Sequence, residues 1–243
     1  MSICIMIGMF LMVNLFLCSS LTWSGQEWVI KSGDNIGPGP NSWSSDNVFV
    51  DSSGNLHLKI TYNRGKWECA QLYSVNTISY GTYQWWIDSS LDFDSHVVLQ
   101  LSTFGDTNGQ NEIDIQFSEW ANPWGNPPTN ARYAVWPSNK KYSRNPGSIS
   151  WNIDLSGTFT TQRFRWNSQS VEFWAIGGHY NIDTTLNVYN NWKYTPSSSL
   201  LIPQQTSANM KLHMSLWLYK DDGRGPSDHQ EVEVVIRGLQ SDN

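Results

Sequence analysis

Apolar and polar side chains alternate along most of the chain behind residue 20. The stretch NLHLKITY (55–62) sets leucine and isoleucine against histidine, lysine and threonine. This period of two is typical of a strand with one buried face. The same pattern recurs at 81–88, 96–104, 111–120, 131–137, 211–220 and 231–239, and 163–178 is typical of a hairpin. No segment there has helical periodicity, so we expect an all-β chain.

The segments between these strands are typical of loops within one domain. The segments 121–130 and 195–207 are rich in Pro, Asn and Ser and are typical of surface loops. A chain of 243 residues suits one large β-sandwich, and no linker interrupts it. Many strands without intervening helices predict two packed antiparallel sheets over residues 21–243.

The N-terminal segment has the pattern of an export signal. Residues 3–18 are apolar apart from Gly8 and Asn14, and small residues follow. We interpret residues 1–20 as a signal peptide cleaved near Ser20, which predicts a secreted or cell-surface protein. A positive n-region is missing, so an uncleaved anchor or a misassigned start stays open. After cleavage only Cys69 would remain, and no disulfide within the chain could form.

Composition excludes several classes of function. The net charge of -6 and the absence of a basic cluster argue against a nucleic-acid partner. The five histidines lack metal-ligand spacing and no glycine-rich phosphate loop occurs, so we expect neither a metal nor a cofactor. Aromatic residues, in contrast, reach 14% of the chain.

The strand EIDIQF carries the most informative chemistry. Strand alternation places Glu112, Asp114 and Gln116 on one face and apolar residues on the other. Neighbouring carboxylates repel and raise each other's pKa, so a merely solvated strand gains nothing from them. Glycoside hydrolysis typically requires two carboxyl groups, a nucleophile and an acid/base, which flank the glycosidic bond.

This strand resembles the Glu-x-Asp-x-Glu motif of glycoside hydrolase family 16, the laminarinase and lichenase group. Three flanking stretches, ISYGTYQWWI, MKLHMSLWLY and PSDHQEVEVVIRGL, are similar to other strands of that family. The match spans roughly residues 45–240. It implies a β-jelly-roll sandwich of two curved antiparallel sheets, with a substrate cleft on the concave face.

The resemblance also implies a role for each polar residue of the strand. Glu112 matches the nucleophile and Asp114 the supporting carboxylate, whereas Gln116 stands where the family has its acid/base Glu. An amide cannot deliver a proton to a leaving alkoxide. Gln84 replaces a further Glu of the family pattern. Glu119 is the alternative acid, although it is far from Glu112 along an extended strand.

Aromatic residues are expected to bind sugar faces. Trp217 shares strand parity with polar neighbours, Trp136 lies on one face with Arg132, and Trp120 follows the catalytic strand. Trp86 shares parity with Gln84, and we expect it in the cleft while Trp85 is buried. Core packing is the alternative for each tryptophan.

Three functions are compatible with these observations. The first is endo-acting, retaining hydrolysis of O-glycosidic bonds in a β-linked glucan-type polysaccharide. The alternative is a catalytically silent carbohydrate-binding protein that kept the cleft and lost the general acid. A structural protein of the cell surface without a sugar ligand is a third reading. We expect the partner to be a neutral β-glucan, the protein to be a monomer, and no membrane contact beyond the signal segment.

Overall fold

The computed structural model describes residues 19–105, 111–122, 129–137, 147–205, 209–220 and 224–242. Almost all of these residues lie in strands, loops and turns, which confirms the all-β prediction. The predicted signal peptide, apart from its last two residues, lies outside the described residues. In the described part of the chain, no helix has the length and apolar character needed to cross a bilayer.

The strands form two antiparallel sheets. In spatial order the first sheet contains β1 (Ser20–Trp23), β2 (Gln26–Ile30), β7 (Lys66–Ser74), β16 (Lys211–Leu218), β9 (Val97–Phe104), β10 (Glu112–Phe117), β11 (Ala131–Trp136) and β12 (Gly147–Trp151). The second contains β5 (Val48–Val50), β6 (Leu56–Asn63), β17 (Val232–Ser241), β8 (Gly81–Asp88), β13 (Phe159–Trp166), β14 (Val171–Gly177) and β15 (Val188–Tyr194).

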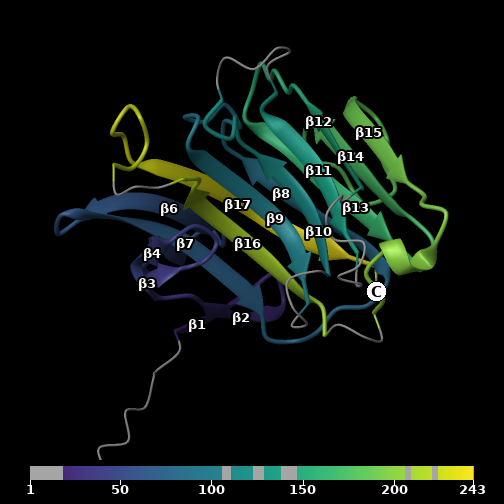
Figure 1. Cartoon of the computed structure of the whole chain (residues 1–243), viewed down its shortest axis with the longest axis horizontal. Coiled ribbons are helices and arrows are strands. Elements are labelled where there is room, and N and C mark those ends of the chain that lie inside the picture. Colours follow the sequence, from purple (N-terminus) through teal and green to yellow (C-terminus); the bar gives the residue numbers. More distant parts are fainter. Residues whose placement is uncertain are drawn as a thin grey trace, which may run out of the picture.

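Short elements complete the fold. They are β3 (Gly33–Ile36), β4 (Asn41–Trp43), and the 3-10 helices η1 (Ser45–Asn47) and η3 (Ser199–Leu201). The β6–β7 hairpin joins the two sheets, and β4 pairs with β7 in the parallel direction. Figure 1 shows β16, β9, β10 and β11 side by side as one curved sheet. This arrangement confirms the predicted jelly-roll sandwich.

The core lies between the sheets because each strand turns its apolar set inward. Leu101, Ile113 and Ile115 of the first sheet are fully buried. They face aromatic side chains of the second sheet, among them Trp85 and Phe164. Since side chains alternate along a strand, the opposite face of the first sheet is left with the polar set. We call that opposite face the site face.

Candidate active site

Strand β10 presents its polar residues on the site face. Ile113, Ile115 and Phe117 are fully buried in the core, so Glu112, Asp114 and Gln116 point the other way. The predicted division of this strand into two faces is therefore confirmed. β10 lies between β9 and β11, and this central position lets neighbouring strands contact its carboxyl groups from both sides.

A glutamine of β9 joins the two carboxyl groups. The Nε2 of Gln100 donates to Glu112 Oε1 and to Asp114 Oδ1, at 2.9 Å each. From the other side, the indole Nε1 of Trp136 donates to Asp114 Oδ2 over 3.0 Å. Gln100 is the register partner of Gln116. The Glu112 side chain therefore leans along the strand toward position 116, which shortens the gap between the two positions.

Burial sets the charge state of this pair. Burial raises the pKa of Glu112, although hydrogen bonds from Asp114 and Gln100 and the charge of Arg132 partly oppose the rise. Asp114 has no exposed surface, and burial raises its pKa well above the usual value, with a further contribution from the Glu112 charge. Two carboxyl groups this close do not readily ionise together. Ionisation of one carboxyl group therefore disfavours ionisation of the other.

Gln116 occupies the third position of the row. Its side chain is 8% exposed, and its Oε1 has no hydrogen-bond partner among the described residues. A buried polar atom left unpaired is costly unless something else satisfies it. An amide here can bind a hydroxyl group, but it supplies no acidic proton.

A cavity of about 550 Å³ lies on the site face beside this pair. Its lining residues come from β10, β9, β16, β7 and the β2–β4 segment: Glu112, Gln100, Ser102, Phe104, His213, Gln71, Tyr73, Lys31, Gly37 and Pro38. A smaller space of about 270 Å³ continues past Tyr73, Phe104 and His213 toward Lys211. We call the two together the Glu112 cavity. Ligand sites of this size usually combine aromatic walls with a few polar groups.

Aromatic and cationic side chains form the far wall of the Glu112 cavity. The His213 ring stacks on Tyr73 at 5.4 Å, and burial together with two lysines lowers the pKa of His213 to about 4, so it is neutral at pH 7. Burial lowers the pKa of Lys31 to about 8. Lys31 donates to the Gly37 carbonyl and lies 4.3 Å from the Trp43 ring centroid. The sequence pattern had not indicated Lys31 at this wall.

The predicted aromatic residues reach different places. Trp136 contacts Asp114 as described above. Trp217 and Trp120 pack on each other with ring centroids 6.3 Å apart, and Trp120 also meets Tyr219 at 5.2 Å. Trp217 is only 6% exposed and belongs to the buried core, and neither tryptophan lines the Glu112 cavity. Sugar binding by Trp120, Trp136 and Trp217 stays a prediction.

The placement of Trp86 in the cleft is wrong. Trp86 lies on β8, which pairs with β13 and β17 of the second sheet. Its Nε1 donates to the Tyr180 carbonyl at 2.8 Å, and its ring covers Gly238. Trp85 is buried as predicted, so the assignment of faces along β8 is right. The error arises because strand parity cannot indicate to which of two sheets a strand belongs.

Glu119 does not line the same cavity as Glu112. It lines a separate depression of about 330 Å³ with Asp92, Asn130 and Asp154. Burial raises the pKa of Glu119, with the charges of Asp92 and Asp94 adding to the rise. No residue lines both this depression and the Glu112 cavity. The geometry therefore gives Glu119 no part in the Glu112 site, and the assignment of Gln116 to the acid/base position stays a prediction.

Besides Lys31, the sequence analysis missed two contributors to the site. Gln100 stands with Ser102 at the polar parity of an otherwise apolar strand, HVVLQLSTF, and this is the signal that could have identified it. Arg132 was noted only as a neighbour of Trp136, although its charge acts on Glu112. In the described residues, no cluster of His, Cys, Asp and Glu is arranged to hold a metal ion.

Comparisons with known proteins place the fold. No family model matches the chain, and no curated protein does either. Among solved structures, the β-glucanase of Bacillus licheniformis has 18% identity and a TM-score of 0.65 over 89% of this chain and 92% of that one. A glycoside hydrolase family 16 endo-glucanase of Bacteroides ovatus has 13% identity and a TM-score of 0.66, covering 88% and 94%.

A third similar structure is described as a pseudo β-1,3-glucanase of Mycobacterium tuberculosis. It has 16% identity and a TM-score of 0.62 over 88% of this chain and 90% of that one. At these identities a structural likeness shows the fold rather than the activity. The chain therefore shares its fold with the β-glucanases of glycoside hydrolase family 16.

Proposed function

We propose that this chain is a carbohydrate-active protein that cleaves O-glycosidic bonds within a β-linked, glucan-type polysaccharide and retains the anomeric configuration. The observation that carries the proposal is the pair of Glu112 and Asp114, bridged by Gln100 at the edge of the Glu112 cavity. Burial and mutual repulsion both disfavour the ionised forms of two neighbouring carboxyl groups. A strand without a function at this position would gain nothing from such a pair. The shared fold of the β-glucanases supports the same proposal.

The geometry assigns a step to each carboxyl group. Ionised Glu112 attacks the anomeric carbon; a carbon–oxygen bond to Glu112 forms as the glycosidic bond breaks. Asp114 hydrogen-bonds Glu112 and thereby orients the nucleophile. Gln116 provides a hydrogen bond but no proton for the departing oxygen. Leaving groups that depart as stable anions are therefore favoured over sugar alkoxides.

A glucan is the proposed substrate because the Glu112 cavity offers aromatic rings and uncharged hydrogen-bonding groups. Two lysines reach it, but Lys31 is engaged by Gly37 and Trp43, and Lys211 lies over the Tyr73 ring at 5.4 Å. We further propose that residues 1–20 direct the chain out of the cell and that it acts as a monomer.

A silent binding protein is the second candidate, and Gln116 is the observation that favours it. Losing a general acid costs about 10²–10⁴ in rate. The test compares an aryl β-glucoside oligomer with an acidic phenol against mixed-linkage β-glucan. An active protein turns over the aryl substrate faster, azide accelerates release of its glycosyl intermediate, and Glu112→Ala abolishes turnover while glucan binding persists. Glucan binding without aryl turnover would establish the silent binder.

A further inference from the structure

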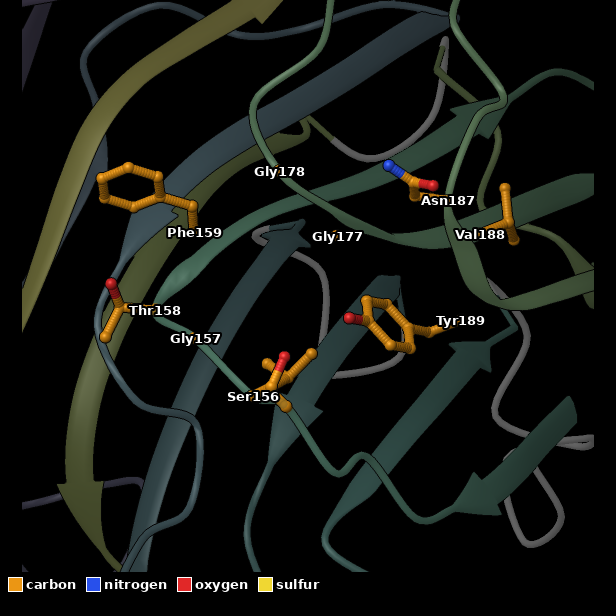
Figure 2. A pocket seen from close by; sticks show the side chains of 10 residues that line it. Ser156, Gly157, Thr158, Phe159, Gly177, Gly178, Asn187, Val188 and Tyr189 are labelled. Atoms are coloured by element: carbon orange, nitrogen blue, oxygen red, sulfur yellow. The ribbon is translucent and has the colours of Figure 1, made fainter.

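A second depression, of about 620 Å³, lies on the other sheet. Segments 155–159, 177–178 and 187–189 line it, where β13 begins, β14 ends and β15 begins. It shares no lining residue with the Glu112 cavity. We call it the β15 pocket, and Figure 2 shows it from close by.

The β15 pocket has the composition of a site for an uncharged, hydroxyl-rich ligand. None of its lining residues among the described positions carries a charge, in a chain whose net charge is -6. Tyr189 is 50% exposed, whereas Phe159, 52% exposed, has one face of its ring stacked on His179 with ring centroids 4.8 Å apart. Arg237, 5.9 Å from the Phe159 ring, is paired with Asp88. Exposed rings beside amide and hydroxyl groups suit the C–H faces and hydroxyls of a sugar.

Tyr189 is held as a platform. A Cβ at Gly177 would stand 2.5 Å from its Cε2, so the Tyr189 ring lies directly against the glycine. In Figure 2 its hydroxyl and the hydroxyl of Ser156 both point toward the middle of the depression. A ring supported by backbone in this way keeps its orientation before a ligand arrives, which reduces the entropy cost of binding.

The segment that leads to Asn187 is held by a buried arginine. Arg163 is 1% exposed, and its guanidinium donates to the carbonyls of Asn181 and Thr184 at 2.9 and 3.0 Å. Asn187 in turn donates to the Tyr180 hydroxyl at 2.6 Å. Burying a guanidinium is expensive, so the shape of segment 178–187 is maintained at a cost.

We propose that the β15 pocket is a second carbohydrate site, which takes a short stretch of the same neutral polysaccharide by stacking a sugar ring on Tyr189. The ligand class rests on the function proposed above. A polymer long enough to engage both sites is retained near the Glu112 cavity, whereas a short glycoside gains nothing from the second site.

The test measures retardation of the full chain in gels that contain mixed-linkage β-glucan, together with turnover of an aryl β-glucoside oligomer. Tyr189→Ala should weaken retardation about threefold to tenfold, the size of one aromatic stacking contact. Gly177→Ala should do the same by displacing the ring, and Tyr189→Phe should restore binding. Tyr62→Ala, at an equally exposed tyrosine on β6, is the matched control. Aryl turnover should stay unchanged in all four variants.

Several outcomes would overturn the proposal. One is equal retardation of wild type and Tyr189→Ala with folding confirmed by an unchanged Tm. Another is a dimer in sedimentation that Tyr189→Ala dissociates, because the pocket would then receive a second copy. If hydrolysis persists and substitution of Tyr189 does not change retardation, the second site is refuted and the proposed enzyme is not. If retardation depends on Tyr189 but no hydrolysis is measured, the proposed enzyme is refuted and the second site is supported.

Discussion

The side-chain amide nitrogen of Gln100 donates a hydrogen bond to each carboxyl group of the Glu112–Asp114 pair, and the bond to Glu112 measures 2.9 Å. This bond stabilises the ionised form of Glu112 and opposes the rise that burial imposes on its pKa. Gln100 on β9 thereby tunes the Glu112 carboxyl group on the neighbouring strand β10. Its contribution is open to measurement through the pH dependence of turnover.

Gln100→Leu should move the acidic limb of the pH profile to higher pH. Without the donor, the pKa of Glu112 rises further, so the ionised form needed for attack appears later as pH increases. On the acidic limb we expect kcat/KM for an aryl glucoside to fall about tenfold relative to wild type at the same pH, which corresponds to the loss of one hydrogen bond to a charged group. Gln71→Leu, in the same cavity, is the control and should leave the limb in place. An unshifted limb in Gln100→Leu would contradict the assigned role.

Gln116→Glu should supply the general acid that the proposed mechanism lacks. The new carboxyl group would stand on a buried, already acidic face, which keeps it protonated at higher pH than a surface glutamate. Glucan hydrolysis is then expected to rise about 10²–10⁴, with little change for an aryl substrate whose phenol needs no proton. Initial rates on both substrates check this. Gln116→Met provides the control without a proton. No gain on glucan would mean that another group already protonates the leaving oxygen.

Asp114→Asn should stabilise the fold increasingly as pH rises. Because the pKa of Asp114 is higher in the folded than in the unfolded chain, the folded state binds more protons, and stability falls as pH rises above the unfolded value. The asparagine variant lacks this loss. The difference in Tm between variant and wild type should therefore be more positive at pH 8 than at pH 4. A difference independent of pH would show that Asp114 titrates normally.

Local periodicity was sufficient for the faces of single strands. It predicted that Glu112 and Asp114 point together, and it predicted the hairpin now seen as β13 and β14. It could not predict the bond from Gln100, because that depends on the register of β9 against β10. The error at Trp86 also concerns tertiary structure, because periodicity does not indicate to which sheet β8 belongs. β15, with the sequence VYNNWKY, was not predicted, since its asparagines obscure the alternation and pairing with β14 forms the strand.

Only tertiary contacts explain why Gln84 stands where the family pattern has a glutamate. Its Oε1 accepts from Arg163 Nε at 2.9 Å, while its Nε2 donates to the Tyr180 carbonyl and to Gln240. A glutamate would keep the acceptor and lose both donated bonds. An amide therefore suits this position on the second sheet, remote from the catalytic pair.

Arg163→Met should loosen segment 178–187 without changing catalysis. The methionine fills similar space but leaves the carbonyls of Asn181 and Thr184 without their donor. We expect a loss of about 2 kcal/mol in the free energy of unfolding, because relief of the buried charge offsets part of the cost. Amide hydrogen exchange in this segment should accelerate, and aryl glucoside turnover should stay constant because Arg163 lies on the second sheet.

Arg165→Met, at an exposed arginine on the same face of β13, is the control and should change stability by less than about 1 kcal/mol. If both variants lose the same stability, or if exchange accelerates evenly across the sheet, Arg163 does not hold this segment in particular.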